Sequence, residues 1–320
     1  MKKRSIFDYF FLIRPVPLAP IWIFMFAGYR IARMHFDGNL PFPCLDVPGK
    51  MWSSFVIYNL LVGAIYIINQ IMDIETDKIN RKLFLLADGY IPVWHAWVET
   101  ILLVIVPGII AYMYFPTAYL VVFVISLIMG IFYSVPPIAV KNRPIWDTFA
   151  NAVGNGFLAF AAGWLSVYKF DPVMFRYGLP YILAAGAAFV CTTVPDIKGD
   201  LAIGKITTAG ALGPASTMLF GILLLVGTIT TGLFTKDWLI VSVAVISLPI
   251  YIYAWRKPTI KNILIAVRTS APLLGILLGI MFPVLMAVAI GIVLSSKIYY
   301  KLRFNVTYPT IIPTREEVQE

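Results

Sequence analysis

Long apolar stretches follow one another along almost the whole chain, and proline, glycine and charged residues mark the intervals between them. A hydrocarbon core about 30 Å thick needs roughly 20 apolar residues in a helix. The pattern therefore predicts nine membrane spans. The predicted spans cover residues 17–34, 52–72, 94–114, 117–135, 148–168, 177–195, 212–234, 238–255 and 271–294.

The predicted fold class is all-α, a polytopic transmembrane helical bundle. The apolar runs are too long and continuous for the alternating strands of a barrel, and backbone groups cannot stay unpaired in lipid. Composition agrees, because 60% of the residues are hydrophobic and 13% are charged, against about 25% charged in a soluble domain. We expect one membrane-embedded domain over residues 1–320, with a cytoplasmic N-terminal segment at 1–16 and a polar tail at 297–320.

The N-terminal apolar stretch does not have the form of a removable signal peptide, because Asp8 interrupts it and Arg14-Pro15 closes it. Cys44 lies in a predicted loop and Cys191 in a predicted span, so we expect no disulfide. Two lone histidines, His35 and His95, are interpreted as interfacial or packed residues, since a metal site needs converging ligands.

The net charge of +9 would suit a nucleic-acid partner, but basic residues beside membrane spans more often record orientation. We therefore expect no nucleic acid. With a cytoplasmic N-terminus, fifteen basic residues lie in inner segments and six in outer ones. The outer six are Arg30, Arg33, Lys50, Lys169, Arg176 and Lys236. This orientation is favoured by the positive-inside rule, and in a prokaryotic host the protein would lie in the cell membrane.

The C-terminal tail does not follow the positive-inside rule in this orientation, because nine spans place its four basic residues outside. They are Lys297, Lys301, Arg303 and Arg315. Splitting the last apolar block near Pro283 gives ten spans and returns them to the cytoplasm. Nine spans are preferred, since a split leaves short spans or places Arg268 within one.

Two groups of acids follow the second and sixth predicted spans. Residues four apart share a helix face, so Asn69, Asp73 and Asp77 form one stripe, and Asp196 and Asp200 form another. Because the two spans run in the same direction, both stripes emerge at one membrane surface. They are expected to face each other across one cavity, with Glu75 pointing elsewhere.

Two carboxylate pairs near hydrocarbon predict a cation site, because like charges repel and are costly to desolvate. Ligands that are all oxygen suit Mg²⁺, Mn²⁺ or Ca²⁺ rather than zinc. Mg²⁺ takes one or two carboxylates and completes its shell with water and substrate phosphate, which implies a diphosphate ligand. Inner-loop residues Lys141, Arg143 and Lys205 are candidates for binding its oxygens. The alternative for the aspartates is that they are ordinary solvated acids in loops. The alternative for the basic residues is that they only set the orientation of the chain in the membrane.

At these residues the sequence resembles the UbiA superfamily of intramembrane prenyltransferases. The positions that match its two aspartate motifs are Asn69, Asp73 and Asp77, then Asp196, Asp200, Gly204 and Thr207. The family's YSxPP element is matched by residues 133–137, and its Arg-Pro ahead of the first span by Arg14-Pro15. Two departures are Gln70, where members often have Asp, and residues 82–89, which lack a Pro-x-Arg-Pro-like stretch ending in Ser-Gly.

The resemblance implies a bundle around a central cavity and transfer of a prenyl group from a prenyl diphosphate to a lipophilic or aromatic acceptor. It implies two Mg²⁺ ions, with Mn²⁺ as the alternative. The implied metal ligands and catalytic residues are Asn69, Asp73, Asp77, Asp196 and Asp200. The implied diphosphate-binding residues are Arg14, Tyr133, Lys141, Arg143 and Lys205. Aromatic faces at Tyr66, Phe157 and Phe160 would suit an allylic cation, although core packing is the favoured role.

Three other functions fit parts of this pattern. A cation transporter or channel also uses membrane acids, but at the midplane of discontinuous helices. A phosphotransferase would show a tighter Asp-rich signature with Asp-Gly and Ala-Arg neighbours. A non-enzymatic scaffold has no positive feature in its favour. Prenyl length and acceptor stay open, the latter among aromatic rings of quinone type, homogentisate, a chlorin carboxylate and a glyceryl phosphate ether lipid.

Overall fold

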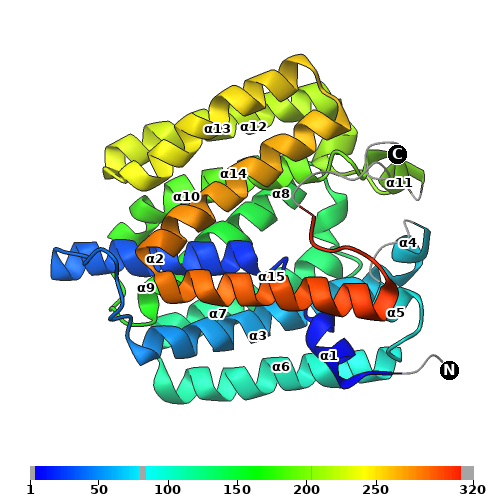
Figure 1. Ribbon diagram of the computed structural model, residues 1–320, viewed down its shortest axis with the longest axis horizontal. Helices are drawn as coiled ribbons and strands as arrows, with labels where there is room; N and C mark the ends of the chain where they lie inside the picture. The colour runs from blue at the N-terminus through cyan, green and yellow to red at the C-terminus, as the bar shows by residue number, and fades with distance from the viewer. Residues whose placement is uncertain (1–3, 80–83, 203, 311–320) are drawn as a thin grey trace.

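The computed structural model describes residues 4–79, 84–202 and 204–310. Its long helices lie side by side in one bundle and run back and forth between two ends (Figure 1). Throughout these ranges the regular structure is helical, with no strand, which confirms the predicted fold class. Lys2, Lys3, Arg81, Lys82 and Arg315, which entered the charge argument, lie outside the described residues.

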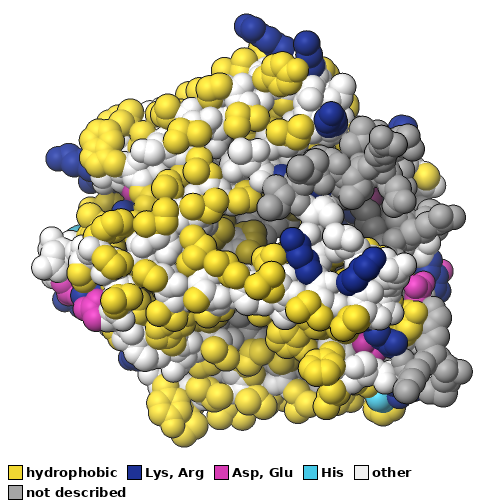
Figure 2. Space-filling view, viewed as in Figure 1, with side chains coloured by type: hydrophobic (Ala, Val, Ile, Leu, Met, Phe, Trp, Pro, Cys, Tyr) yellow, Lys and Arg dark blue, Asp and Glu magenta, His cyan; other side chains and the backbone are white. Residues whose placement is uncertain are grey.

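Eight of the described helices are long and apolar enough to cross a membrane. They are α3 (Gly49–Met72), α6 (Val93–Tyr114), α7 (Thr117–Ser134), α10 (Val173–Thr192), α12 (Thr208–Thr235), α13 (Trp238–Arg256), α14 (Ile260–Met281) and α15 (Pro283–Phe304). The protein is therefore an integral, multi-pass membrane protein. Hydrophobic side chains cover much of the face in Figure 2, as lipid-facing helices require.

Two further passes fill the middle of the bundle. One is α2 (Ala19–Asp37), and the other is the continuous run of α8 (Trp146–Asn151), the π-helical turn η2 (Ala152–Leu158) and α9 (Ala159–Leu165). Short elements join the long ones. They are α1 (Ile6–Leu12), α4 (Ile74–Ile79), α5 (Phe84–Ala87), η1 (Val140–Asn142) and α11 (Ile197–Ala202).

The last apolar block differs from the preferred prediction of one span over 271–294. It forms two helices of 22 residues each, α14 and α15, separated at Phe282. Pro283 starts α15, because its ring cannot donate the backbone hydrogen bond that would continue α14. The alternative of ten spans is the one that fits. Residues 297–304, expected in a polar tail, belong to α15, so Lys297 and Lys301 lie at the end where α4 and α11 also lie (Figure 1).

Two glycines bring α2 and α9 into backbone contact at the centre of the bundle. A Cβ on Gly28 would lie 1.9 Å from the carbonyl oxygen of Phe160, and one on Gly163 would lie 1.8 Å from that of Met25. Small residues let membrane helices approach closely where the hydrophobic effect supplies little attraction between them. This contact holds α2 against the pass that begins at α8 and ends with α9.

We predict that Gly28→Ala destabilises the protein by at least about 3 kcal/mol, because the new methyl group meets backbone that cannot rotate away. Gly291→Ala is the matched control, since nothing lies within 4 Å of its Cβ position. It is expected to be neutral or stabilising by up to about 1 kcal/mol. Thermal unfolding in detergent measures both, and equal midpoints for the two variants would contradict the close contact.

The carboxylate of Asp8 ties α1 to the end of α15. It accepts hydrogen bonds from the Tyr299 hydroxyl at 2.7 Å and from Arg303 Nε and Nη2 at 3.1 and 3.0 Å. Phe11 stacks on Tyr299 with ring centroids 3.8 Å apart. Burial alone would raise the pKa of Asp8, but the bonds from Arg303 and Tyr299 outweigh burial and hold it below the ordinary 3.8.

Asp8→Asn is predicted to lower stability by about 2 kcal/mol, because the charge that Arg303 faces is removed. A carboxyl whose pKa is lowered on folding stabilises above its ordinary pKa and loses this effect as pH falls through the folded value. The difference from wild type should therefore shrink on acidification below about pH 4. Glu75→Gln, at an exposed ion pair, serves as the control and should change stability little.

Candidate active site

The two acidic turns lie at the same end of the bundle. In Figure 1, α4 and α11 sit together at the right-hand side, near the ends of α3 and α10 that they follow. The bundle therefore places both predicted stripes on one membrane surface, and it does so because α3 and α10 run in the same direction.

The first turn keeps helical hydrogen bonding while the chain bends. Asp73 ends α3 with φ of −104° and ψ of 9°, yet its N–H donates to the Asn69 carbonyl at 3.0 Å, and the Asp77 N–H donates to the Asp73 carbonyl at 2.8 Å. Asn69, Asp73 and Asp77 thus stay on one face, as predicted. Glu75 points away, with an exposed side chain that pairs with Lys78 at 2.8 Å.

The second turn is closed by a glycine. The Asp200 N–H donates to the Asp196 carbonyl at 2.8 Å, and Gly204, with φ of +75°, lets the Lys205 N–H donate to the Asp200 carbonyl at 2.9 Å. This left-handed conformation is one that glycine adopts without steric cost. The reversal brings the Lys205 ammonium within 3.1 Å of the Asp200 carboxylate, which is 3% exposed.

Lys141 pairs with the first turn. The short helix η1, after the YSVPP element, carries its ammonium to 2.6 Å from Asp73 Oδ1. Burial lowers the pKa of Lys141 below its ordinary value, Asp73 and Asp77 oppose that change, and Lys205 adds to it by repulsion. Lys141 therefore lies beside the acids of the first turn and within electrostatic range of Lys205, which pairs with the second turn.

The other predicted phosphate-binding residues take different places. The Tyr133 hydroxyl hydrogen-bonds Asn151 and has Asp73 and Asp147 among its electrostatic neighbours. Arg143 is exposed at the surface beside η1 rather than in the cluster. Asn69 donates its amide N–H to Ser134 at 3.1 Å, which leaves its carbonyl oxygen as the available ligand atom.

Backbone strain accompanies these residues. Arg14, Ala139 and Ile145 have φ of 57°, 35° and 71°, in the region that L residues avoid. Ile145 is held there by its N–H bond to the Thr208 hydroxyl at 2.6 Å. Such conformations cost about 1–3 kcal/mol each and concentrate at functional sites. They flank the segment that carries Lys141 and the entry to α2.

Two residues near Arg14 were missed by the sequence reasoning. Tyr308, in the segment after α15, has Arg14 and Arg268 as electrostatic neighbours, and Arg14 also acts on Tyr66. An arginine inside an apolar span is itself a signal of function, but Arg268 was weighed only in counting spans. Tyr308 lies in a polar tail and carries no sequence signal.

Tyr66, Phe157 and Phe160 have packing partners. The Tyr66 hydroxyl donates to the Pro17 carbonyl at 3.2 Å. Phe157 stacks on Phe175 with centroids 5.2 Å apart, and Phe160 lies 5.0 Å from Tyr181. These contacts agree with the core-packing role that was favoured for the three residues.

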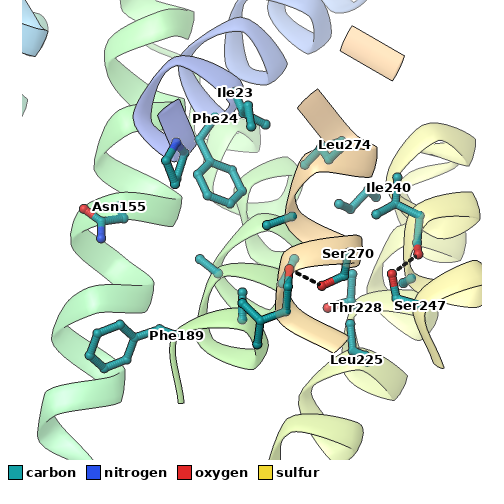
Figure 3. A pocket seen from close by; sticks show the side chains of 18 of the residues that line it. Ile23, Phe24, Asn155, Phe189, Leu225, Thr228, Ile240, Ser247, Ser270 and Leu274 are labelled. Atoms are coloured by element: carbon teal, nitrogen blue, oxygen red, sulfur yellow. Dashed lines mark hydrogen bonds between the residues drawn. The ribbon is translucent and has the colours of Figure 1, made fainter. Parts of the chain in front are cut away.

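A cavity of about 250 Å³ lies inside the bundle, and none of the site's aspartates or lysines lines it. Figure 3 shows its walls, formed by α2, η2, α10, α12, α13 and α14. Thr192, the last residue of α10, and Asn151, the partner of Tyr133, line it. The hydroxyls of Thr228 and Ser247 donate to carbonyls of their own helices at 2.9 and 2.7 Å, so the walls are largely apolar.

The oxygen donors fit a hard divalent cation that shares its shell with a ligand. Among the described residues, no three or more carboxylate, histidine or cysteine side chains converge closely enough to hold a metal alone. Mg²⁺ needs only one or two carboxylates from a protein when phosphate and water supply the rest. Asp73 with Asp77, and Asp196 with Asp200, provide such pairs, and Lys141 and Lys205 balance their charge.

Fold and site together define a polytopic helical membrane protein with two aspartate turns at one end of the bundle and an apolar cavity inside it. The chain belongs to the UbiA prenyltransferase family, whose sequence profile matches residues 21–263. The predicted family resemblance is thereby confirmed.

Individual relatives agree with this membership. The chain is 25% identical over 231 residues to digeranylgeranylglyceryl phosphate synthase of Sulfurisphaera tokodaii, covering 71% of this chain and 77% of that one. It is 29% identical over 184 residues to a probable chloroplastic homogentisate phytyltransferase 2 of Oryza sativa subsp. japonica, covering 53% of this chain. The match spans about half of the plant relative, 48% of its length.

Solved structures share the fold. A UbiA homologue from Archaeoglobus fulgidus, determined with GPP and Mg²⁺ bound, superposes with a TM-score of 0.70 at 18% identity. The match covers 87% of this chain and 99% of that one. The same homologue was also determined with Cd²⁺, with a TM-score of 0.67 at 20% identity over 87% of this chain and 99% of that one.

Proposed function

We propose that the protein catalyses Mg²⁺-dependent transfer of a prenyl group from a prenyl diphosphate to a lipophilic acceptor in the membrane, with release of diphosphate. The observation that carries the proposal is the placement of two aspartate turns at one end of the bundle, where Lys141 pairs with Asp73 and Lys205 pairs with Asp200. Family membership supports the reaction class. The carbon–oxygen bond to diphosphate breaks, a bond to an acceptor carbon or oxygen forms, and the acceptor loses a proton.

The aspartates of the two turns are the proposed metal ligands. Asp73, Asp77, Asp196 and Asp200, with the carbonyl of Asn69, would hold two Mg²⁺ ions. When bound, Mg²⁺ neutralises diphosphate oxygens and stabilises diphosphate as the leaving group. Mn²⁺ offers the same kind of coordination.

Lysines and arginines would complete the diphosphate site. Lys141 and Lys205 lie 2.6 and 3.1 Å from carboxylate oxygens of Asp73 and Asp200. When Mg²⁺ binds these carboxylates together with a diphosphate, the same two ammonium groups would donate hydrogen bonds to the diphosphate oxygens. Arg14 and Arg268, which share Tyr308 as a neighbour, supply further positive charge. Arg143, exposed nearby, would act at the entrance.

The cavity of Figure 3 would receive the prenyl chain. Its walls are largely apolar, and the hydroxyls of Thr228 and Ser247 are satisfied by their own helices, so most of its surface suits a hydrocarbon tail. Exclusion of water protects the allylic cation that forms when diphosphate leaves. The acceptor would enter from the bilayer, and a quinone-type ring and a glyceryl phosphate ether lipid are the candidates to test first.

The charge pattern favours a cytoplasmic active-site end. With α14 and α15 as separate helices, Lys297, Lys301 and Arg303 lie at that end, and Arg303 pairs there with Asp8 of α1. The positive-inside rule then applies to the tail as well as to the loops. A transporter is not retained as a second function, because the four aspartates sit at span ends beside lysines rather than at the midplane.

We predict that Asp73→Asn and Asp200→Asn each reduce transfer from a radiolabelled prenyl diphosphate by about 10²–10³-fold, the usual effect of losing one electrostatic stabiliser of the transition state. A chelator should abolish transfer, and added Mg²⁺ should restore it. Glu75→Gln should stay within about twofold of wild type. Full activity in either aspartate variant, once folded, would refute the assigned roles.

Lys141→Met should raise the KM for the prenyl diphosphate and the inhibition constant of pyrophosphate by about tenfold or more, because one charge-assisted hydrogen bond is lost. The side chain is buried, so methionine fills the space without leaving an unpaired charge of its own. Arg256→Met, at an exposed position at the end of α13, is the matched control. Equal inhibition of all three proteins by pyrophosphate would exclude Lys141 from the diphosphate site.

A further inference from the structure

A second cavity lies on the outside of the bundle, apart from the site described above. It is an open groove of about 520 Å³ between α1, α3 and α6. Its lining includes Tyr9, Leu60, Trp94, His95, Glu99 and Leu103, none of which lines the cavity of Figure 3. Neighbouring side chains of α6, such as Val98 and Leu102, are about half exposed, at 48% and 55%, so the groove faces lipid.

Glu99 is the unusual member of this lining. It is a carboxylate in an apolar span, and its Oε2 is shielded and has no hydrogen-bond partner among the described residues. Among the described residues, no lysine or arginine lines the groove to balance it. An uncompensated carboxylate in hydrocarbon is costly, and ionisable residues in spans mark functional sites. A ligand with a positive charge or a hydrogen-bond donor would compensate the Glu99 carboxylate.

The depth of Glu99 suits a lipid headgroup. It lies six residues into α6, which begins at Val93 at the active-site end, so its Cα is about 9 Å from the helix start. Long side chains on a helix lean toward its N-terminus, which brings the carboxylate about one turn closer to the membrane surface. Trp94 and Trp97, exposed on the same helix, have the interfacial position that tryptophan favours.

His95 adds a donor beside the carboxylate. The hydrogen bond between the Tyr9 hydroxyl and His95 Nδ1 is 2.5 Å long. When the hydroxyl donates, Nδ1 accepts and the proton of the neutral ring sits on Nε2. His95 and Glu99 are four residues apart and share a helix face. The groove thus presents a carboxylate for a cation and an N–H for an anion, with apolar side chains below both.

We propose that this groove binds one phospholipid whose headgroup ends in a primary ammonium. The ammonium pairs with Glu99, the phosphate accepts from His95 Nε2, and an acyl chain lies along Leu60 and Leu103. The headgroup carries both charges that the polar residues complement, and a primary ammonium offers N–H donors that a quaternary one lacks. The proposal concerns a lipid site and does not depend on the transferase reaction.

The test compares two lipids that differ only in the ammonium. The full-length protein is titrated with phosphatidylethanolamine or with phosphatidylcholine of the same acyl chains in detergent, and bound lipid is counted by native mass spectrometry. Wild type should retain one phosphatidylethanolamine with about tenfold preference, the effect of one charge-assisted hydrogen bond. Equal retention of the two lipids would overturn the proposal.

Three variants separate the site from general lipid binding. Glu99→Gln keeps the shape and removes the charge, so the preference should disappear. Leu102→Trp keeps Glu99 and obstructs the groove from its exposed rim, so the preference should disappear here too. Glu75→Gln makes the same chemical change at an exposed position outside the groove and should retain the preference. Persistence of the preference in Glu99→Gln or in Leu102→Trp would refute this site.

Discussion

Pairing between carboxylates and ammonium groups at one end of the bundle is the constraint on which the candidate site depends. Asp73 with Lys141 and Asp200 with Lys205 are partly or fully buried pairs. Removing one partner of such a pair leaves an uncompensated charge, which is far costlier than losing an exposed ion pair. The lysines therefore stabilise the aspartates when no metal ion is bound. A divalent cation, which carries more charge, can replace the lysines as the partner of the carboxylates.

Packing at the centre of the bundle supports this end of the molecule. Gly28 and Gly163 let α2 and α9 touch through their backbones, and the pass that contains α9 begins at α8 beside the site. Asp147 at the start of α8 accepts the N–H of Thr208 at 2.8 Å, so α8 and α12 are joined next to the second aspartate turn. The contact between α2 and α9 and the bond between α8 and α12 therefore help to fix the position of the second aspartate turn.

Much of the candidate site was predictable because its signal is local. The four-residue spacing of Asn69, Asp73 and Asp77 sets one helix face, and hydrogen bonds preserve that face even though the helix bends at Asp73. The partner of each aspartate was not predictable, since Lys141 and Lys205 are two of many basic loop residues. Tyr308 comes within electrostatic range of Arg14 and Arg268 only because the segment after α15 folds back toward α14 and the start of the chain's first long helix.

The sequence by itself determined that the chain is a membrane-spanning helical bundle, because hydrocarbon thickness and backbone hydrogen bonding demand long apolar helices, and composition records this directly. It also determined which acids share a face. Only the tertiary structure decided that Phe282 divides the last block, that Lys141 pairs with Asp73, and that Glu99 lines a groove with His95 and Tyr9. These are contacts between distant segments, and hydrophobic periodicity carries no information about which helices become neighbours.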